Sequence, residues 1–301
     1  MASGIGVLVA DRIAAASVED HKLTSPVQTL TTDSGVADPL LGMPAESIVE
    51  RVAEVIRPLI AGAKPGSIGV AFPGIVRNGV IEDSPNLVQL KGQPMLAMLT
   101  SALRQEVGDT SISIFNDADV VAAGLAAKRG QLDRLIRVWT LGNGIGYGRY
   151  PSLEGVWEGG HIVVSLDPKE QFCGCGGRGH LEGIMGNRAM RLRFMDLEPE
   201  EIFEHAKKGE QRCVEFVKLW HRALAAATAN SVHMDGPGKF FITGTNARFL
   251  NVSLVAEYLH EMVKLSPLQG YSLEVVPGGE EIAVLGAAVD AMQAQARNGN
   301  T

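Results

Sequence analysis

A strand-turn-strand pattern occurs twice in this 301-residue chain, and it limits the possible folds more than any other feature. Residues 5–19 read as two short apolar strands around a turn, followed by a more polar strand over residues 22–32. A similar pattern returns over residues 136–150 and 161–164. Predicted helices and strands alternate after each copy. Such a duplication predicts two α/β domains that face each other across a cleft.

The segments after each copy have the apolar spacing of buried strands and amphipathic helices. We expect an N-terminal α/β domain over residues 1–115, completed by the last helix at 281–301, and a C-terminal α/β domain over 116–280. The predicted strands lie at residues 68–72, 111–115, 239–243 and 272–276, and the predicted helices at 44–61, 94–107, 119–128, 199–208, 211–233, 252–264 and 281–297.

Composition excludes several classes of protein. The chain is 46% hydrophobic and 20% charged, which suffices for two globular cores. A net charge of −7 leaves no basic surplus for phosphates, so we expect no nucleic-acid partner. Asp11 and Arg12 interrupt the apolar start, so we expect neither a signal peptide nor a membrane span. Three cysteines do not make a disulfide framework, and we expect a reducing, cytoplasmic location.

Residues 158–182, EGGHIVVSLDPKEQFCGCGGRGHLE, gather metal-ligand residue types in one glycine-rich segment. His161, Cys173, Cys175 and His180 supply two imidazoles and two thiolates, the ligand set of a closed tetrahedral zinc site. The glycines between them allow the tight turns that such convergence needs. The alternative is a reactive or disulfide-prone Cys-Gly-Cys in a flexible loop, with two ordinary surface histidines.

This segment resembles the signature of the ROK family (repressor, open reading frame, kinase), E-x-G-H followed by C-x-C-G-x-x-G-C-x-E. One position departs, because His180 stands where the family has a third cysteine, and imidazole still serves as a zinc ligand. The resemblance implies a two-domain actin-like, ribonuclease-H-like fold and strengthens the zinc prediction. The matching residues are Glu158, Gly160, His161, Cys173, Cys175, Gly176, Gly179 and Glu182.

The sequence Asn116-Asp117-Ala118-Asp119 lies where a predicted strand ends and a helix begins. A carboxylate there could accept the proton of a sugar hydroxyl that attacks a phosphoryl group. Alternatively, Asp117 or Asp119 only caps the helix, a role that suits aspartate. The motif resembles the family's N-D-A-N, which implies that Asp117 is the catalytic base and Asn116 a sugar ligand.

Further residues are assigned to the sugar by resemblance. Asn86 in SPNL is similar to the family's P-N-L substrate loop, although an asparagine after proline also suits a simple Asx-turn. Glu158, His161 and Glu182 correspond to hydroxyl-binding residues of the family. His161 would then serve twice, with one ring nitrogen on zinc and the other on the sugar, which would fix its tautomer.

Two glycine loops resemble nucleotide-binding loops of the family. Gly142, Asn143, Gly144 and Gly146 follow a predicted strand, and their backbone N–H groups could approach a phosphate. Gly244 and Thr245 resemble the adenosine-side loop. The family's first phosphate loop, D-x-G-G-T-K, supplies glycines for the phosphates and an aspartate that organises magnesium. It is missing here, because residues 7–12 read Val-Leu-Val-Ala-Asp-Arg.

The resemblance implies an ATP-dependent hexose kinase, glucokinase-like, that uses magnesium with ATP and carries a structural zinc. The alternative is a sugar-binding pseudokinase or sensor that has lost the first phosphate loop. Glucose, fructose, mannose and N-acetylated hexosamines would all suit these residues. Repressors of the family carry an additional N-terminal helix-turn-helix domain, for which we expect no room before the first strand. A homodimer is possible, as dimers are common in the family, and no membrane partner is expected.

Overall fold

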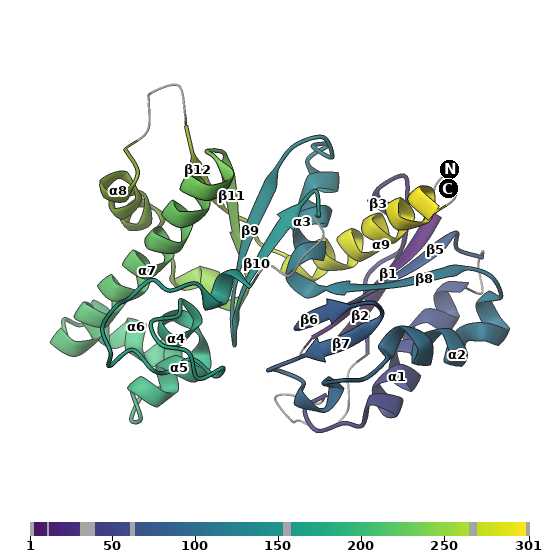
Figure 1. Ribbon diagram of the computed structural model, residues 1–301, viewed down its shortest axis with the longest axis horizontal. Coiled ribbons are helices and arrows are strands. Elements are labelled where there is room, and N and C mark those ends of the chain that lie inside the picture. The colour runs from purple at the N-terminus through teal and green to yellow at the C-terminus, as the bar shows by residue number, and fades with distance from the viewer. Residues whose placement is uncertain are drawn as a thin grey trace. The chain divides into compact units, whose positions relative to one another are not determined.

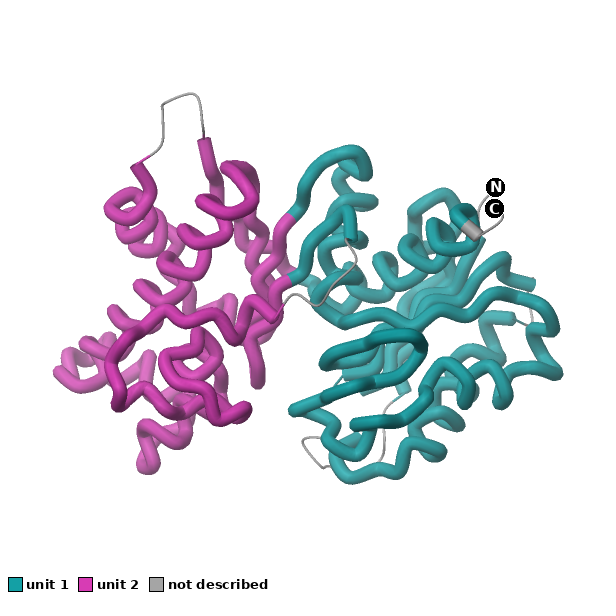
Figure 2. Tube along the Cα trace, viewed as in Figure 1, with its two compact units in different colours: residues 1–136, 148–156, 278–301 teal, residues 137–147, 157–277 magenta. Residues whose placement is uncertain are grey.

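The computed structural model describes residues 3–10, 12–30, 40–60, 64–152, 158–264 and 270–298. The chain forms two compact units, coloured separately in Figure 2. Unit 1 contains residues 1–136, 148–156 and 278–301, and unit 2 contains residues 137–147 and 157–277. Unit 1 therefore extends beyond the predicted boundary at residue 115, and it includes the last helix. Every helix in the described ranges is too short or too polar to cross a membrane.

Unit 1 is built on a six-stranded sheet in the order β3-β2-β1-β5-β8, with β4 paired to β2. The strand β1 runs antiparallel to β2 and parallel to β5, and β5 runs parallel to β8. The polar strand predicted at 22–32 is two short strands instead, with residues 31–32 outside the described ranges. The strands are β1 (Ser3–Val9), β2 (Ile13–Glu19), β3 (Lys22–Leu23), β4 (Gln28–Leu30), β5 (Ser67–Phe72) and β8 (Ser111–Asn116), and a separate hairpin consists of β6 (Ile75–Arg77) and β7 (Val80–Asp83).

Helices α1 (Ala45–Ile60) and α2 (Met95–Val107) pack on one face of this sheet, and α9 (Gly279–Asn298) packs on the other (Figure 1). Alternate residues of β1 face opposite sides, as in any strand. Val7 is fully buried in the core with α1 and α2. A Cβ atom on the next residue back, Gly6, would lie 1.8 Å from the carbonyl oxygen of Val284 on α9. Glycine is therefore required where α9 crosses the sheet.

Helix α3 (Asp117–Lys128) belongs to unit 1 because it packs tightly against α9. A Cβ atom on Gly124 would lie 1.9 Å from the carbonyl oxygen of Ile282, and one on Gly286 would lie 1.7 Å from that of Val120. The two glycines let the helix backbones approach each other directly. This contact places the N-D-A-D motif in unit 1.

The second sheet has four strands in the order β10-β9-β11-β12, with β11 parallel to both β9 and β12. Trp139 and Trp220 are fully buried in its core. The boundary between the units crosses β10 after Tyr147. The strands are β9 (Ile136–Leu141), β10 (Ile145–Tyr150), β11 (Lys239–Thr243) and β12 (Ser272–Val275), and the helices are α4 (Glu182–Met185), α5 (Asn187–Arg193), α6 (Pro199–Lys207), α7 (Gln211–Asp235) and α8 (Val252–Met262).

The segment at residues 161–164, predicted as a strand of this sheet, is not part of it. It follows a short 3-10 helix, Gly159–His161, and pairs with the cysteine-containing segment through an isolated bridge between Val163 and His180. The amide of Leu181 donates to the carbonyl of Ile162 at 3.0 Å. The β-branched residues thus adopt an extended conformation, but their backbone groups are bonded to a loop rather than to the sheet.

Candidate functional site

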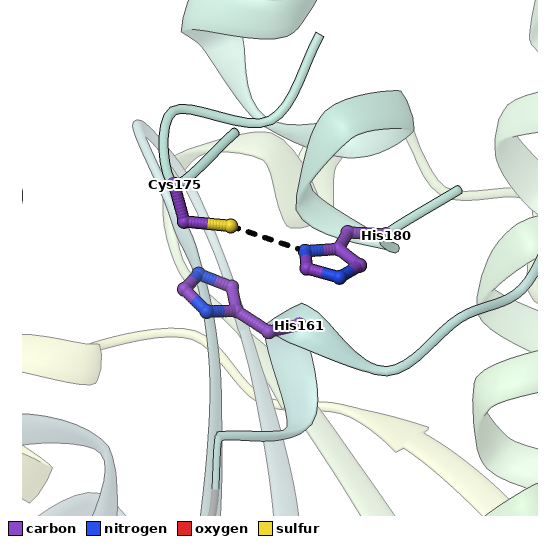
Figure 3. Close-up of side chains that lie close together, drawn as sticks. All are labelled: His161, Cys175 and His180. Carbon is purple, nitrogen blue, oxygen red and sulfur yellow. Dashed lines mark hydrogen bonds between the residues drawn. The ribbon is translucent and has the colours of Figure 1, made fainter. Parts of the chain in front are cut away.

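The cysteine loop, residues 158–182, brings the four predicted zinc ligands together. Cys175 Sγ lies 3.2 Å from His180 Nδ1 and 3.3 Å from Cys173 Sγ. The rings of His161 and His180 are stacked with their centroids 5.4 Å apart. Figure 3 shows His161, Cys175 and His180 directed toward one another, and their ligand atoms all lie within 4.8 Å of each other. Three of the four predicted ligands, His161, Cys175 and His180, therefore converge, and Cys173 lies beside Cys175.

Glu182, which the resemblance assigned to the sugar, also lies among these metal-type ligands, and together they form the metal-type cluster. Its Oε1 atom lies 3.8 Å from His161 Nε2 and 4.0 Å from Cys173 Sγ. His161, Cys173 and Glu182 form a second group whose ligand atoms lie within 4.8 Å of one another. The cluster therefore offers two imidazoles, two thiols and a carboxylate, a donor set that suits zinc.

The surroundings of the cluster shift the pKa values of three of its side chains. Burial raises the pKa of the Cys173 thiol to about 12. A hydrogen bond to Glu182 raises the pKa of His161, whereas burial and the neighbouring His161 lower the pKa of His180. Both loop cysteines are free thiols. A zinc ion would require them as thiolates, so its binding would release protons.

An ion pair fastens the cysteine loop to helix α5. Arg193 donates to Glu170 through both terminal nitrogens, Nη1 at 3.0 Å from Oε1. The guanidinium group also lies 4.4 Å from the ring centre of Phe172. The carbonyl of Glu170 accepts a hydrogen bond from the amide of Gly179 at 2.7 Å. Sequence analysis missed Glu170 and Arg193, because a pair separated by 23 residues follows no local motif.

The glycine turn, residues 142–146, connects β9 to β10 beside this cluster. The amide of Ile145 donates to Glu182 Oε2 at 2.9 Å. On the other side of the turn, the amide of Asn187 donates to the carbonyl of Gly142 at 3.2 Å. The turn that resembles a phosphate loop is therefore bonded directly to a residue of the metal-type cluster.

The second predicted nucleotide loop, at residues 244–245, lies beside the glycine turn. Gly244 has a φ of +98°, and a Cβ atom there would lie 2.3 Å from the carbonyl oxygen of Leu141. Asn246 donates through Nδ2 to the carbonyl of Gly142 at 3.3 Å. Thr245 is exposed. The structure thus brings together the two glycine loops that the sequence assigned to one nucleotide.

In unit 1, the N-D-A-D motif starts α3 as predicted, but its cap is Asn116. The Asn116 Oδ1 atom accepts from the amides of Ala118 at 2.8 Å and Asp119 at 3.2 Å. The interpretation in which Asp117 or Asp119 is the N-cap is therefore wrong. Asn116 Nδ2 also donates to the carbonyl of Gly74 at 2.8 Å. Asp117 is half-buried in the first helical turn, with Oδ1 accepting from the amide of Ala118.

Asn86 is exposed in the loop after β7. The loop is ordered by Ser84, which is 1% exposed and donates through Oγ to the carbonyl of Pro73 at 2.8 Å. The same hydroxyl accepts from the amide of Leu87 at 3.3 Å. Sequence analysis missed Ser84, although serine before proline is a known turn signal.

The first hairpin, formed by β1, β2 and their turn, differs from a phosphate loop. Val7 and Val9 are fully buried, and Val9 pairs with Ile13. Arg12 donates to Glu280 of α9, with Nε 2.6 Å from Oε2 and Nη2 3.1 Å from Oε1. Position 7, where the resemblance would place a magnesium-organising aspartate, is therefore part of the hydrophobic core.

Comparison with known sequences identifies the relatives of this chain. The ROK family profile matches residues 38–293. The chain is 28% identical over 258 residues to a glucokinase of Pyrobaculum calidifontis, covering 80% of this chain and 83% of that one. It is 26% identical over 263 residues to an N-acetylmannosamine kinase of Haemophilus influenzae, covering 81% and 84% respectively. These curated relatives are sugar kinases.

Solved structures show the same fold at lower identity. A ROK hexokinase of Thermus thermophilus superposes with a TM-score of 0.80 at 23% identity, covering 98% of this chain and 99% of that one. A Streptomyces griseus ROK glucokinase, solved with glucose and AMPPNP, gives 0.71 at 20% identity over 97% and 99%. A ROK transcriptional regulator gives 0.70 at 17% identity over 97% and 79%. The predicted two-domain actin-like α/β fold is confirmed, and the chain belongs to the ROK family.

Proposed function

We propose that this protein is an ATP-dependent hexose kinase. Asp117 is the general base, and the sugar hydroxyls bind Asn86, Asn116, Glu158, His161 and Glu182. The glycine turn and the loop at residues 244–245 bind the nucleotide. The observation that carries the proposal is the position of Glu182, 2.9 Å from the amide of Ile145 in the turn and 3.8 Å from His161 in the cluster.

The chemistry assigned to Asp117 is proton acceptance from the attacking hydroxyl. In phosphoryl transfer the protein mainly positions the reactants and stabilises charge, and a carboxylate orients the nucleophile. Asp117 suits this role because Asn116 takes over the capping of α3.

A zinc ion on His161, Cys173, Cys175 and His180 would fix the shape of the cysteine loop. The two thiols and two imidazoles suit that ion, and His161 would keep its second nitrogen for a sugar hydroxyl or for Glu182. The family's magnesium-organising aspartate has no counterpart at position 7, which is the buried Val7. The proposed mechanism therefore assigns no role to a magnesium ion at position 7.

A phosphorylation assay across glucose, fructose, mannose and N-acetylated hexosamines, with ATP as donor, tests the proposal. We expect turnover of at least one sugar, and heat on binding of that sugar in calorimetry. Neither turnover nor heat with any of them would refute the hexose assignment.

Metal analysis tests the zinc site separately. Protein purified without added metal should contain about one zinc per chain. Cys175→Ala should lose the metal, whereas Cys213→Ala should keep it because Cys213 is buried in α7, outside the cluster. Equal zinc content in the two variants, or none in the wild type, would contradict the assignment.

One observation favours the sugar-binding pseudokinase as a second candidate. The first hairpin buries Val9 where a phosphate loop would need glycine, and Arg12 at its end is paired with Glu280. A protein of this kind would bind a hexose with measurable heat but transfer no phosphoryl group from ATP. The same assay and calorimetry therefore separate the two candidates.

A further inference from the structure

We propose that Asn187 is a positioning residue for the phosphoryl donor, because it locks the glycine turn to the loop after β11. This inference rests on the proposed function in assigning a nucleotide to the two loops. The locking itself is a property of unit 2 alone.

Asn187 contacts both loops through one side chain. Its Nδ2 atom donates to Asn143 Oδ1 in the glycine turn at 3.1 Å. Its Oδ1 atom accepts from Asn246 Nδ2, in the segment after Gly244, at 2.7 Å. A carboxylate lacks the donor and an aliphatic side chain lacks both groups, so an amide is the side chain that satisfies the two loops together.

The backbone around Asn187 reinforces this connection. The Asn187 amide and the Asn246 side chain both donate to the carbonyl of Gly142, at 3.2 and 3.3 Å. A Cβ atom on Gly186 would lie 2.9 Å from the carbonyl oxygen of Asn143, so residue 186 approaches the turn closely. Asn246 is itself 2% exposed, so the loss of one of the two hydrogen bonds that its Nδ2 donates is costly.

The glycine turn is therefore held at two places by one short segment, residues 182–187. Glu182 bonds the amide of Ile145, and Asn187 bonds Gly142 and Asn143. The first anchor touches the metal-type cluster and the second touches the loop after β11. Loss of the Asn187 side chain should thus disturb the nucleotide loops while leaving the hexose and metal residues in place.

We expect Asn187→Ala to weaken AMPPNP binding about tenfold, the effect of losing roughly one to two net hydrogen bonds. Hexose affinity and zinc content should stay at wild-type values, and the Michaelis constant for ATP should rise more than that for the sugar. Because Asn187 acts with Asn246, the double variant Asn187→Ala/Asn246→Ala should lose less affinity than the sum of the single losses.

Asn251→Ala is the matched control. Asn251 is the N-cap of α8 in the same unit, where its Oδ1 accepts from the amide of Leu254 at 3.1 Å. Removing this cap should lower stability without changing AMPPNP affinity. Equal weakening by Asn187→Ala and Asn251→Ala would show general destabilisation and overturn the proposal.

A measurement without ligand keeps this inference separate from the proposed function. Asn187→Ala should speed amide hydrogen exchange over residues 142–146, and Asn251→Ala should not. Unchanged exchange, or AMPPNP affinity within about twofold of wild type in Asn187→Ala, overturns the positioning role. If wild-type protein fails to bind AMPPNP, the ATP assignment falls and the role of Asn187 as a donor-positioning residue falls with it, while faster exchange would still show the lock.

Discussion

The two hairpins at the start of the two sheets have the same strand-turn-strand topology, but their turns contain different residue types. In the first, β1–β2, the last strand pair is Val9 with Ile13. The second, β9–β10, turns over residues 142–146, which contain three glycines and one asparagine. Both copies of the strand-turn-strand unit keep their strands, and the second copy has the glycine-rich turn that we propose binds the nucleotide.

The partners of the two turns explain this difference physically. In the first hairpin the polar contact joins two side chains of opposite charge, Arg12 and Glu280, which satisfy each other. Such an exposed pair contributes little stability, but it engages the Arg12 guanidinium at the end of the hairpin. In the second hairpin, side chains of Glu182, Asn187 and Asn246 bond the turn from outside. That turn is held in shape by its surroundings.

The largest expected effect is on catalysis. Asp117→Asn should lower sugar phosphorylation by about 10²–10⁴-fold, because the amide still forms hydrogen bonds but cannot accept the proton. Hexose affinity should stay close to wild type. Asp109→Asn, an exposed aspartate of the same unit, is the control and should retain full activity. If Asp117→Asn turned over normally, the base would be another group. If the wild type phosphorylates a sugar and Asp117→Asn does not, the glycine-rich second hairpin suffices for phosphoryl transfer without a phosphate loop in the first.

The first hairpin itself is tested by Val7→Asp, which recreates the family's aspartate. Val7 is fully buried, so an unpaired carboxylate there should cost about 3–5 kcal/mol of unfolding free energy. Val88→Asp, at a position 64% exposed, should change stability by less than about 0.5 kcal/mol. Urea unfolding measures both. A stable Val7→Asp protein with raised phosphorylation would mean that the hairpin opens, and the contrast between the hairpins would fail.

The anchor of the second hairpin is tested by Glu182→Ala. Hexose binding should weaken by about 1.5–3 kcal/mol, the range for losing a charged hydrogen-bond partner. AMPPNP binding should weaken as well, because the amide of Ile145 loses its acceptor. Glu158→Ala should weaken hexose binding similarly but affect AMPPNP less. Calorimetry with each ligand separates these effects. Unchanged AMPPNP affinity in Glu182→Ala would remove the proposed connection between cluster and turn.

Much of the fold was predictable because periodicity is a local signal. Continuous apolar runs gave β5 and β11, and helical spacing gave α2 and α7, within a few residues of their ends. The error at residues 161–164 has a tertiary cause. Val163 and Val164 favour extended backbone, but the partner that takes their hydrogen bonds is the cysteine loop. The sequence shows that these valines prefer an extended backbone, but it does not show which segment accepts or donates their hydrogen bonds.

The candidate site was predictable where its chemistry is dense along the chain. Cys173, Cys175 and His180 lie within eight residues, so their convergence needs only a tight loop. Asn187 was missed because its partners Asn143 and Asn246 are 44 and 59 residues away. The cap of α3 was misassigned because asparagine and aspartate cap helices almost equally well. Only the helix start, at Asn116, decides between them.

A smaller effect should distinguish the units by pH. His221 is buried in unit 2, where its Nδ1–H donates to the carbonyl of Val217 at 2.7 Å and its Nε2 accepts from the amide of Asn251 at 2.9 Å. The ring is therefore neutral, and burial lowers its pKa. Since the unfolded chain binds this proton near pH 6.5, the stability that His221 contributes is present above that pH and is lost as pH falls through the folded pKa.

Tryptophan fluorescence isolates this effect, because all three tryptophans, at positions 139, 157 and 220, fall within the residue ranges of unit 2. The urea midpoint measured by fluorescence should fall between about pH 7.5 and pH 5.5 in wild type, and less steeply in His221→Gln, which has no proton to gain. Exposed His233→Gln is the control and should keep the wild-type slope. His161, whose pKa is raised, contributes with the opposite sign in both proteins, so it cancels in the difference. Equal slopes in wild type and His221→Gln would show that the acid sensitivity of unit 2 does not arise at the junction of α7 and α8.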